Sequence, residues 1–132
     1  MSGVSVIRYT LANDASVLAV VPATRIMAGN LPLSVTLPAI SVRQISGNNL
    51  KHIKQTASEF VTERVQVSVL ATTYIQQKSL LSLVKAALPS VRATVNSVVV
   101  DSISQEFTGP DLKNEDPIIY EQSVDYFVKY ID

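Results

Sequence analysis

The chain has 132 residues, a formal net charge of zero, and 47% hydrophobic against 17% charged residues. This composition is typical of one globular domain, here residues 1–132, and excludes a disordered or fibrous chain. Because the sequence contains no cysteine, disulfide frameworks, thiolate nucleophiles and cysteine metal sites are also excluded. A balanced net charge argues against general nucleic-acid binding.

The charges are divided unevenly along the chain. Residues 1–66 carry six bases and three acids, whereas residues 67–132 carry five bases and eight acids, so the halves have charges of plus three and minus three. Two interpretations remain open: a chance distribution, or a subunit whose faces attract opposite faces of its neighbours. The N-terminus lacks the basic start of a secretory signal, and the apolar run at 17–21 is too short to span a bilayer. A soluble protein without a membrane partner is expected.

Apolar periodicity predicts the elements of the first half. Residues 1–20 are expected to form an amphipathic helix, broken near Asn13 and Asp14, because apolar side chains recur at helical spacing. Pro22 ends this helix, and residues 25–27 are expected to form a short edge strand. Alternating apolar residues predict strands at 40–46 and 64–71. The polar segment between them, 47–62, is either a mobile loop or a projecting arm of the hairpin.

The second half begins with a helix signal. Thr73, with Gln76 three residues later, has the form of a capping box, and the helix it begins is expected to run to Leu88 before Pro89. Its core stripe is expected to contain Leu80, Val84 and Leu88, with Gln77, Leu81 and Ala87 beside them.

Two more strands, 93–107 and 118–131, are expected to follow, joined by an acidic loop at 108–117. The predicted fold is therefore α+β, in the order α-β-β-α-β-β. It has an antiparallel sheet of about four main strands and two helices packed on one face.

The search for catalytic groups gives little support for an enzyme. His52 is the only histidine, so a two-histidine metal site cannot form, and its place between Lys51 and Lys54 is typical of a solvated loop. Asp111, Glu115 and Asp116 do not have calcium-site spacing. The four glycines are scattered, which gives no support for a phosphate cradle. We therefore expect no enzyme activity, no cofactor and no metal.

The pattern as a whole resembles a known family. A predicted N-terminal helix leads to TRIMAGNLP at 24–32, LPAISVRQIS at 37–46 and a polar insertion. Then come RVQVSVLATTYIQQKSLLSLVKAAL at 64–88 and closing strands that end in DYFVKYI at 125–131. This arrangement resembles the tail-completion family of long-tailed bacteriophages, also called tail terminators or head-to-tail joining proteins. The most specific piece is the strand-Thr-Tyr-helix unit at 64–88. The second is R-I-x-x-G-x-x-P at 25–32, followed by L-P-A-I at 37–40.

The resemblance implies a structural virion protein that assembles as a hexameric ring on the end of a finished tail tube. Such a ring stops tail polymerisation and offers a surface to the head connector or neck protein. Its place would be the head-tail junction of the virion, after assembly in the host bacterial cytoplasm. DNA would pass through the ring without sequence-specific binding.

The two polar loops are the candidate assembly sites, because loops on a rigid scaffold usually carry function. Lys51, His52 and Lys54 are expected to face the tail tube or the adjacent subunit. Asp111, Lys113, Glu115 and Asp116 are expected to face the lumen or a basic connector, because lysine-rich walls would retain DNA phosphates. The segment 47–62 is longer and more basic than the family pattern, so its role stays open.

Three alternatives remain. The chain could be another neck or head-completion ring protein, or a small dimeric α+β module that binds a ligand. An enzyme that uses His52 is the third.

Overall fold

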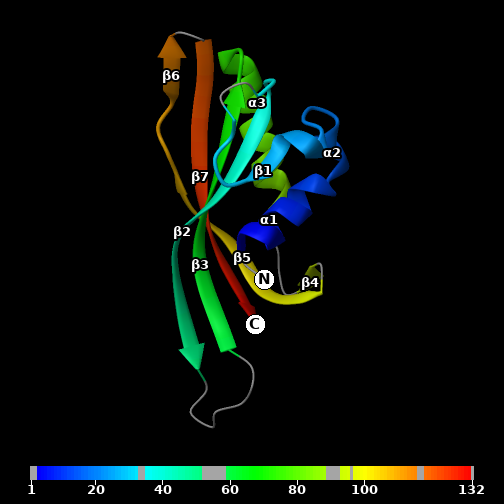
Figure 1. Cartoon of the computed structure of the whole chain (residues 1–132), viewed down its shortest axis with the longest axis vertical. Coiled ribbons are helices and arrows are strands. Elements are labelled where there is room, and N and C mark those ends of the chain that lie inside the picture. Colours follow the sequence, from blue (N-terminus) through cyan, green and yellow to red (C-terminus); the bar gives the residue numbers. More distant parts are fainter. Residues whose placement is uncertain are drawn as a thin grey trace.

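The computed structural model describes the chain in six segments: residues 3–32, 35–51, 59–88, 93–95, 97–115 and 118–131. At residues 48–51, 59–60 and 93 only the backbone is described. Within these segments one curled sheet carries helices on one of its faces (Figure 1). The helices are α1 (Gly3–Ala12), α2 (Ala15–Leu18) and α3 (Tyr74–Ala87), with a 3₁₀ turn η1 (Ala23–Arg25). The strands are β1 (Ile26–Ala28), β2 (Ala39–Lys51), β3 (Glu59–Ala71), β4 (Ala93–Val95), β5 (Val98–Thr108), β6 (Leu112–Glu115) and β7 (Ile118–Ile131).

The predicted break in the N-terminal helix is confirmed. α1 ends at Ala12, and the carboxylate of Asp14 accepts a hydrogen bond from the Val17 amide at 3.0 Å, which caps α2. An aspartate in this position satisfies one of the amides that the first turn of a helix leaves without a partner. Apolar side chains of both helices are buried, namely Val6, Ile7, Leu11 and Val17.

The sheet has the strand order β1-β2-β3-β7-β5-β4, with β6 also paired to β7. β3 and β7 lie at its centre and pair antiparallel from Phe60↔Ile131 to Ala71↔Tyr120. β5 and β6 share the other side of β7: β5 pairs with residues 124–131 and β6 with residues 118–121. The chain therefore bends between Thr108 and Leu112 and then continues beside β7 as β6.

The expectation of four main antiparallel strands in the order α-β-β-α-β-β was too simple in three places. The predicted strand 93–107 is two strands, β4 and β5, and Ser97 in the turn between them has a φ of 68°. The predicted loop 108–117 contains β6. The short edge strand β1 was expected, but it runs parallel to β2. The α+β class and the helix-covered face are as predicted.

The capping signal at Thr73 works as the sequence indicates, with one difference. The Thr73 hydroxyl accepts a hydrogen bond from the Gln76 amide at 3.1 Å. The Gln76 side chain reaches the amide of Thr72 at 3.2 Å, one residue before the capping residue. The predicted stripe is confirmed, because Gln77, Leu80, Leu81 and Val84 are the buried residues of α3.

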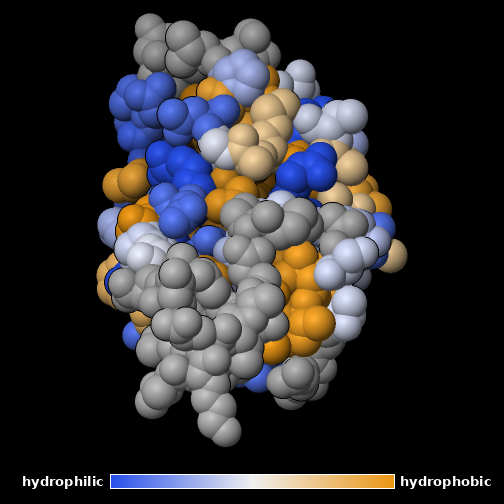
Figure 2. Space-filling model, turned by 60° about the horizontal axis from the view of Figure 1, so that its bottom comes forward, coloured by the Kyte–Doolittle hydropathy of each residue, from blue (hydrophilic) through white to orange (hydrophobic). Residues whose placement is uncertain are grey.

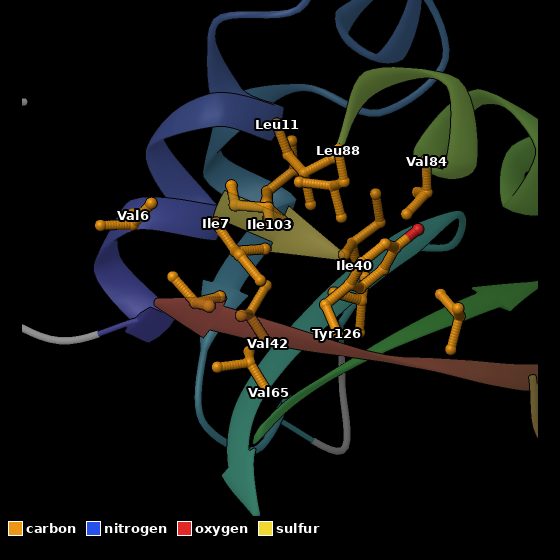
Figure 3. Close-up of a cluster of buried hydrophobic side chains, with 14 of the residues drawn as sticks. Val6, Ile7, Leu11, Ile40, Val42, Val65, Val84, Leu88, Ile103 and Tyr126 are labelled. Carbon is orange, nitrogen blue, oxygen red and sulfur yellow. The ribbon is translucent and has the colours of Figure 1, made fainter. Parts of the chain in front are cut away.

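The core lies between the helices and the face of the sheet that carries Val65, Val67 and Val69 of β3. All three side chains are fully buried, so the inward face predicted for this strand is confirmed. In Figure 3, Val84 and Leu88 at the end of α3 lie over Ile40 and Tyr126 of the sheet. Valine and isoleucine dominate this face, as expected for β-branched residues on a pleated surface.

A buried carboxylate joins three parts of the fold. Glu63 of β3, only 6% exposed, accepts hydrogen bonds from the Gly3 amide at 2.5 Å and from the Tyr130 hydroxyl at 2.8 Å. The negative charge lies at the N-terminus of α1, where the helix dipole favours it. A Cβ atom at residue 3 would lie 2.6 Å from the Glu63 Oε2 atom, so any other residue there would displace the Glu63 carboxylate from its present position.

Candidate functional site

The polar segment 47–62, called the arm below, extends the β2–β3 hairpin. The β2–β3 ladder continues to Lys51↔Glu59, with an irregularity between Gln44 and Ser46. In its described residues, 47–51 and 59–62, the segment has the second of the two possibilities left open by the sequence, a projecting arm of the hairpin rather than a loop. Lys51 is the last residue of β2, and only its backbone is described. The candidates His52 and Lys54 lie outside the described residues.

Asp111 is held by side chains of α3. Its carboxylate accepts hydrogen bonds from the Lys78 ammonium at 2.5 Å and from the Tyr74 hydroxyl at 2.9 Å. The hydrogen bond from Lys78, followed by that from Tyr74, lowers the pKa of Asp111, and the hydrogen bond to Asp111 raises the pKa of Lys78. Lys78 also donates to Gln122 of β7 at 2.8 Å. We call these four residues the Asp111 cluster.

The Asp111 cluster fixes the bend between β5 and β6. The Gln122 amide group donates to the Gly109 carbonyl at 2.9 Å, and the Gly109 amide donates to the Ser123 carbonyl at 2.8 Å. The bend in the predicted acidic loop is thus tied to both α3 and β7, a contact that the sequence did not predict. Both charged side chains of the ion pair are still accessible, since Lys78 is 40% and Asp111 44% exposed.

The other candidates of this loop lie on β6. Lys113 is 3.5 Å from the Glu115 carboxylate and 5.4 Å from the centre of the Tyr120 ring. The charge of Glu115, and then that of Tyr120, raises the pKa of Lys113. Both Lys113 and Glu115 are exposed, which suits a surface that meets a partner. Asp116 lies outside the described residues.

The two candidate sites lie at opposite ends of the molecule. In Figure 1 the end of the β2–β3 hairpin is at the bottom of the long axis, and β6 is at the top. The structure therefore brings Asp111, Lys113 and Glu115 together at one end and keeps them apart from Lys51.

The face of the sheet opposite the helices carries paired polar side chains. Arg64 donates to Asp125 through Nε at 2.9 Å, and its Nη2 lies 2.7 Å from the same oxygen. The hydroxyls of Ser68 and Ser123 lie 2.8 Å apart, which adds a second cross-strand link. An open depression of about 280 Å³ lies on this face, lined by Asn30, Leu31, Ser41, Arg43, Ser68, Leu70 and Glu121.

Several large apolar side chains are exposed to solvent. Among the described residues, those at least half exposed are Ile45, Ile75, Phe107, Leu112 and Ile118. Seen with the lower end turned forward, the surface has open hydrophobic areas beside hydrophilic ones (Figure 2). Exposed apolar patches on a folded protein often mark a contact with another molecule.

The described part of the chain has neither a metal-binding cluster nor a helix that could span a membrane. No group of three or more His, Cys, Asp or Glu side chains there could hold a metal ion. In the same segments, no helix has the length and apolar character needed to cross a membrane.

Sequence reasoning missed several contacts that organise these surfaces. Lys78 and Tyr74 were counted only as part of α3, and Asp111 lies 33 residues beyond Lys78. Glu63, which joins α1 to β7, lies between the polar segment 47–62 and the predicted strand 64–71 and was given no role. Its only early signal is a charged residue at an inward position of the alternation in β3.

Comparison with known proteins gives a family and a fold. A family model described as "Tail completion protein gp17" matches residues 5–126. A solved chain from the "Virion of native gene transfer agent (GTA) particle" superposes with a TM-score of 0.70 and 11% sequence identity. That match covers 99% of this chain and 96% of the other. No match was found among curated proteins.

Proposed function

Because the chain belongs to the tail completion protein gp17 family, we propose that it forms a ring on the end of a phage tail tube and stops tail polymerisation. The ring also provides the surface for joining to the head connector. The family consists of structural proteins of phage tails. The observation that carries the proposal is the family match, which extends from residue 5 to residue 126 and so includes every helix and strand from α2 to β6 and most of α1 and β7.

Two features of the molecule support this function. The arm and the Asp111 cluster lie at opposite ends (Figure 1), as a subunit between a tail tube and a connector requires. The solved chain with the same fold belongs to a virion particle, which supports a place for this chain in a virion. Function then lies in surfaces rather than in a pocket.

The residues of each end have distinct roles in this proposal. Lys51, His52 and Lys54 of the arm contact the tail tube or the adjacent subunit. Asp111, Lys113, Glu115 and Asp116 face the lumen or the rim that meets the connector. Acidic groups near the lumen let DNA pass, because they do not hold phosphates by counterion release. The ring contact is heterologous, and the opposite charges of the two halves favour it.

Electron microscopy of tails assembled without this protein tests the proposal. We expect tails of uncontrolled length that fail to join heads, and we expect the purified protein to restore both properties. The mass of the protein bound to each tail end should equal that of six copies of the chain. Tails of normal length that still lack heads would instead indicate another neck or head-completion protein. If the protein is a dimer and tails assemble normally without it, both the tail-completion and the neck-protein functions are contradicted, and the ligand-binding module is favoured.

A further inference from the structure

We propose that neighbouring copies in the ring meet through side chains on two opposite sides of the molecule. Arg8, Arg25 and Arg43 form one contact surface, called the arginine side below, and Glu106 and Glu115 form the other, called the acidic side. This inference rests on the proposed function, because it needs a ring of identical copies, and it names the groups through which the copies meet. The partner of the arginine side is thus a second copy of this chain.

The three arginines are held by uncharged groups around β1. Nε of Arg8 donates to the carbonyl of Ile26 at 2.9 Å, and Nε of Arg25 donates to the carbonyl of Pro38 at 3.1 Å. Arg43 donates to two side-chain amide oxygens, at 2.6 and 3.3 Å. No ion pair joins any of the three to a described carboxylate. Each arginine is half-buried, so its position is fixed while part of it stays accessible to another molecule.

The arginine side belongs to a part of the sequence without acidic residues. No Asp or Glu occurs from residue 15 to residue 58, a range that supplies η1, β1 and all of β2. Glu121 of β7 lines the same depression as Arg43, but no ion pair joins these two described residues. Carboxylates from another molecule can therefore neutralise the arginines. A planar guanidinium fits a carboxylate with two parallel hydrogen bonds, which favours such a contact.

The acidic side lies at the other end of the strand order. β5 and β6 both pair with β7, on the side away from β3, whereas β1 and β2 lie beyond β3. Glu106 of β5 is exposed and has no hydrogen bond or ion pair with a described residue. The side chain of Glu115 on β6 is 76% exposed, and its partner Lys113 is 3.5 Å away. An ion pair this exposed contributes little free energy, so Glu115 can bind an arginine of another copy instead.

An aromatic ring adds to the acidic side. Phe107 follows Glu106 in the chain and is 55% exposed. A guanidinium can lie flat on such a ring while its N–H groups bond to a neighbouring carboxylate. The contact would also remove the apolar ring from water. Residues 106 and 107 together therefore offer an arginine both a charge and a stacking surface.

The distribution of charge sets which sides meet. Two arginine sides, or two acidic sides, would place like charges against each other, so contact between unlike sides is favoured. Each copy then uses its arginine side toward one neighbour and its acidic side toward the other. This is a heterologous contact, which closes into a ring when the rotation between copies permits.

Charge reversal on either side tests the contact. The first variant carries Arg25→Glu with Arg43→Glu, and the second carries Glu106→Arg with Glu115→Arg. Each variant alone brings like charges together at every contact, so neither should form a ring on tail ends. In an equal mixture, alternating copies bring unlike charges together at every contact. The mixture should therefore restore a six-subunit ring with three copies of each variant, measured as the mass of full-length protein bound to each tail end.

The control variant is Lys85→Glu, which reverses a charge on α3 and belongs to neither side. It should form rings as the wild type does. Circular dichroism and urea unfolding show that each variant is folded before its assembly is measured. Arg8 is left unchanged in all of them, because its hydrogen bond to Ile26 holds β1 against α1. Rings formed by either charge-reversed variant alone would overturn the inference, as would folded variants whose mixture forms no ring.

A second measurement uses a conservative variant. A carbodiimide links a lysine amine to a carboxylate that it touches but does not react with arginine, so Arg25→Lys with Arg43→Lys makes the contact detectable. In rings assembled on tail ends from ¹⁵N-labelled and unlabelled copies, we expect linked peptides that join residue 25 or 43 of one copy to Glu106 or Glu115 of another. Rings without these links overturn the inference and leave the proposed function intact. A wild-type protein that stays a monomer and never joins tail ends overturns both.

Discussion

Single residues in the core differ in how well their polar groups are satisfied. The Glu63 carboxylate has two donors at short distance. In contrast, the Gln77 amide group and the Tyr126 hydroxyl are fully buried and have no hydrogen-bond partner among the described residues. A buried polar group without a partner costs about 1–3 kcal/mol. Substitutions that remove these two polar groups should therefore raise the free energy of unfolding.

Replacing Tyr126 by Phe should leave the free energy of unfolding at pH 7 unchanged or raise it by about 1 kcal/mol, because the unpaired hydroxyl is removed. Burial raises the pKa of Tyr126 from 10.0 to about 12. Above pH 10 the unfolded chain loses this proton first, so the folded state loses stability between pH 10 and pH 12, by roughly 3 kcal/mol. Urea unfolding across this pH range should show a smaller alkaline loss in the variant.

Tyr9→Phe is the matched control, because Tyr9 is 41% exposed and loses the same hydroxyl at the surface. Its alkaline loss should equal that of the wild type. An equal alkaline loss in Tyr126→Phe would mean that Tyr126 is solvated in the native state, contrary to its burial.

At the scale of elements, α3 depends on its first turn. Thr73→Ala removes the hydroxyl that accepts from the Gln76 amide and should lower the free energy of unfolding by about 1 kcal/mol. Thr73→Ser keeps an acceptor at the same position and should lose much less. Urea denaturation of the three proteins measures both differences. Equal losses for alanine and serine would show that the methyl group, not the cap, matters there.

The elements that sequence reasoning found are those whose signals are local. The break at Asp14, the cap at Thr73 and the inward face of β3 all rest on neighbours a few residues apart. β6 could not be found in this way, because all four of its side chains are exposed and leave no alternation. Its pairing is set by β7, which supplies a free edge. The β4–β5 turn was missed because valines lie on both sides of it, and serine seldom adopts a positive φ.

At the candidate sites, polar composition indicated that the segment 108–117 reaches the surface, and its residues 110–115 are exposed. It could not show that Asp111 is bound by Lys78 and Tyr74 of α3, because that contact depends on the packing of the helix against β7. The strand order of the sheet was also not predicted, because no local signal contains it.

At the scale of the whole molecule, the arm and the Asp111 cluster form two ends that can be tested separately. Lys51→Glu with Lys54→Glu should leave the monomer folded but weaken attachment to the ring or the tail. Added salt should weaken wild-type attachment in a similar way, because exposed charges are screened over about 10 Å at 0.1 M. Circular dichroism and a tail-binding assay across a salt series measure the two effects.

Charge reversal at the other end provides a comparison for this variant. Lys113→Glu on β6 alters an exposed residue at the end opposite the arm, and it should not reproduce a tail-specific defect. Wild-type capping by the Lys51, Lys54 double variant at every salt concentration would mean that the arm is a solvated projection without a role in assembly.

The contacts of Glu63 show that the chain could begin and end at other residues without changing the fold. They bring Gly3 and Tyr130 to a single side chain, and the two ends of the chain lie near each other (Figure 1). A short linker could therefore join the two ends of this sequence, and new ends could be opened between Lys51 and Glu59. Such a circular permutant should fold with the wild-type circular dichroism spectrum, because close termini tolerate rejoining. It would divide the arm, and we expect it to fail to cap tails while remaining a stable monomer.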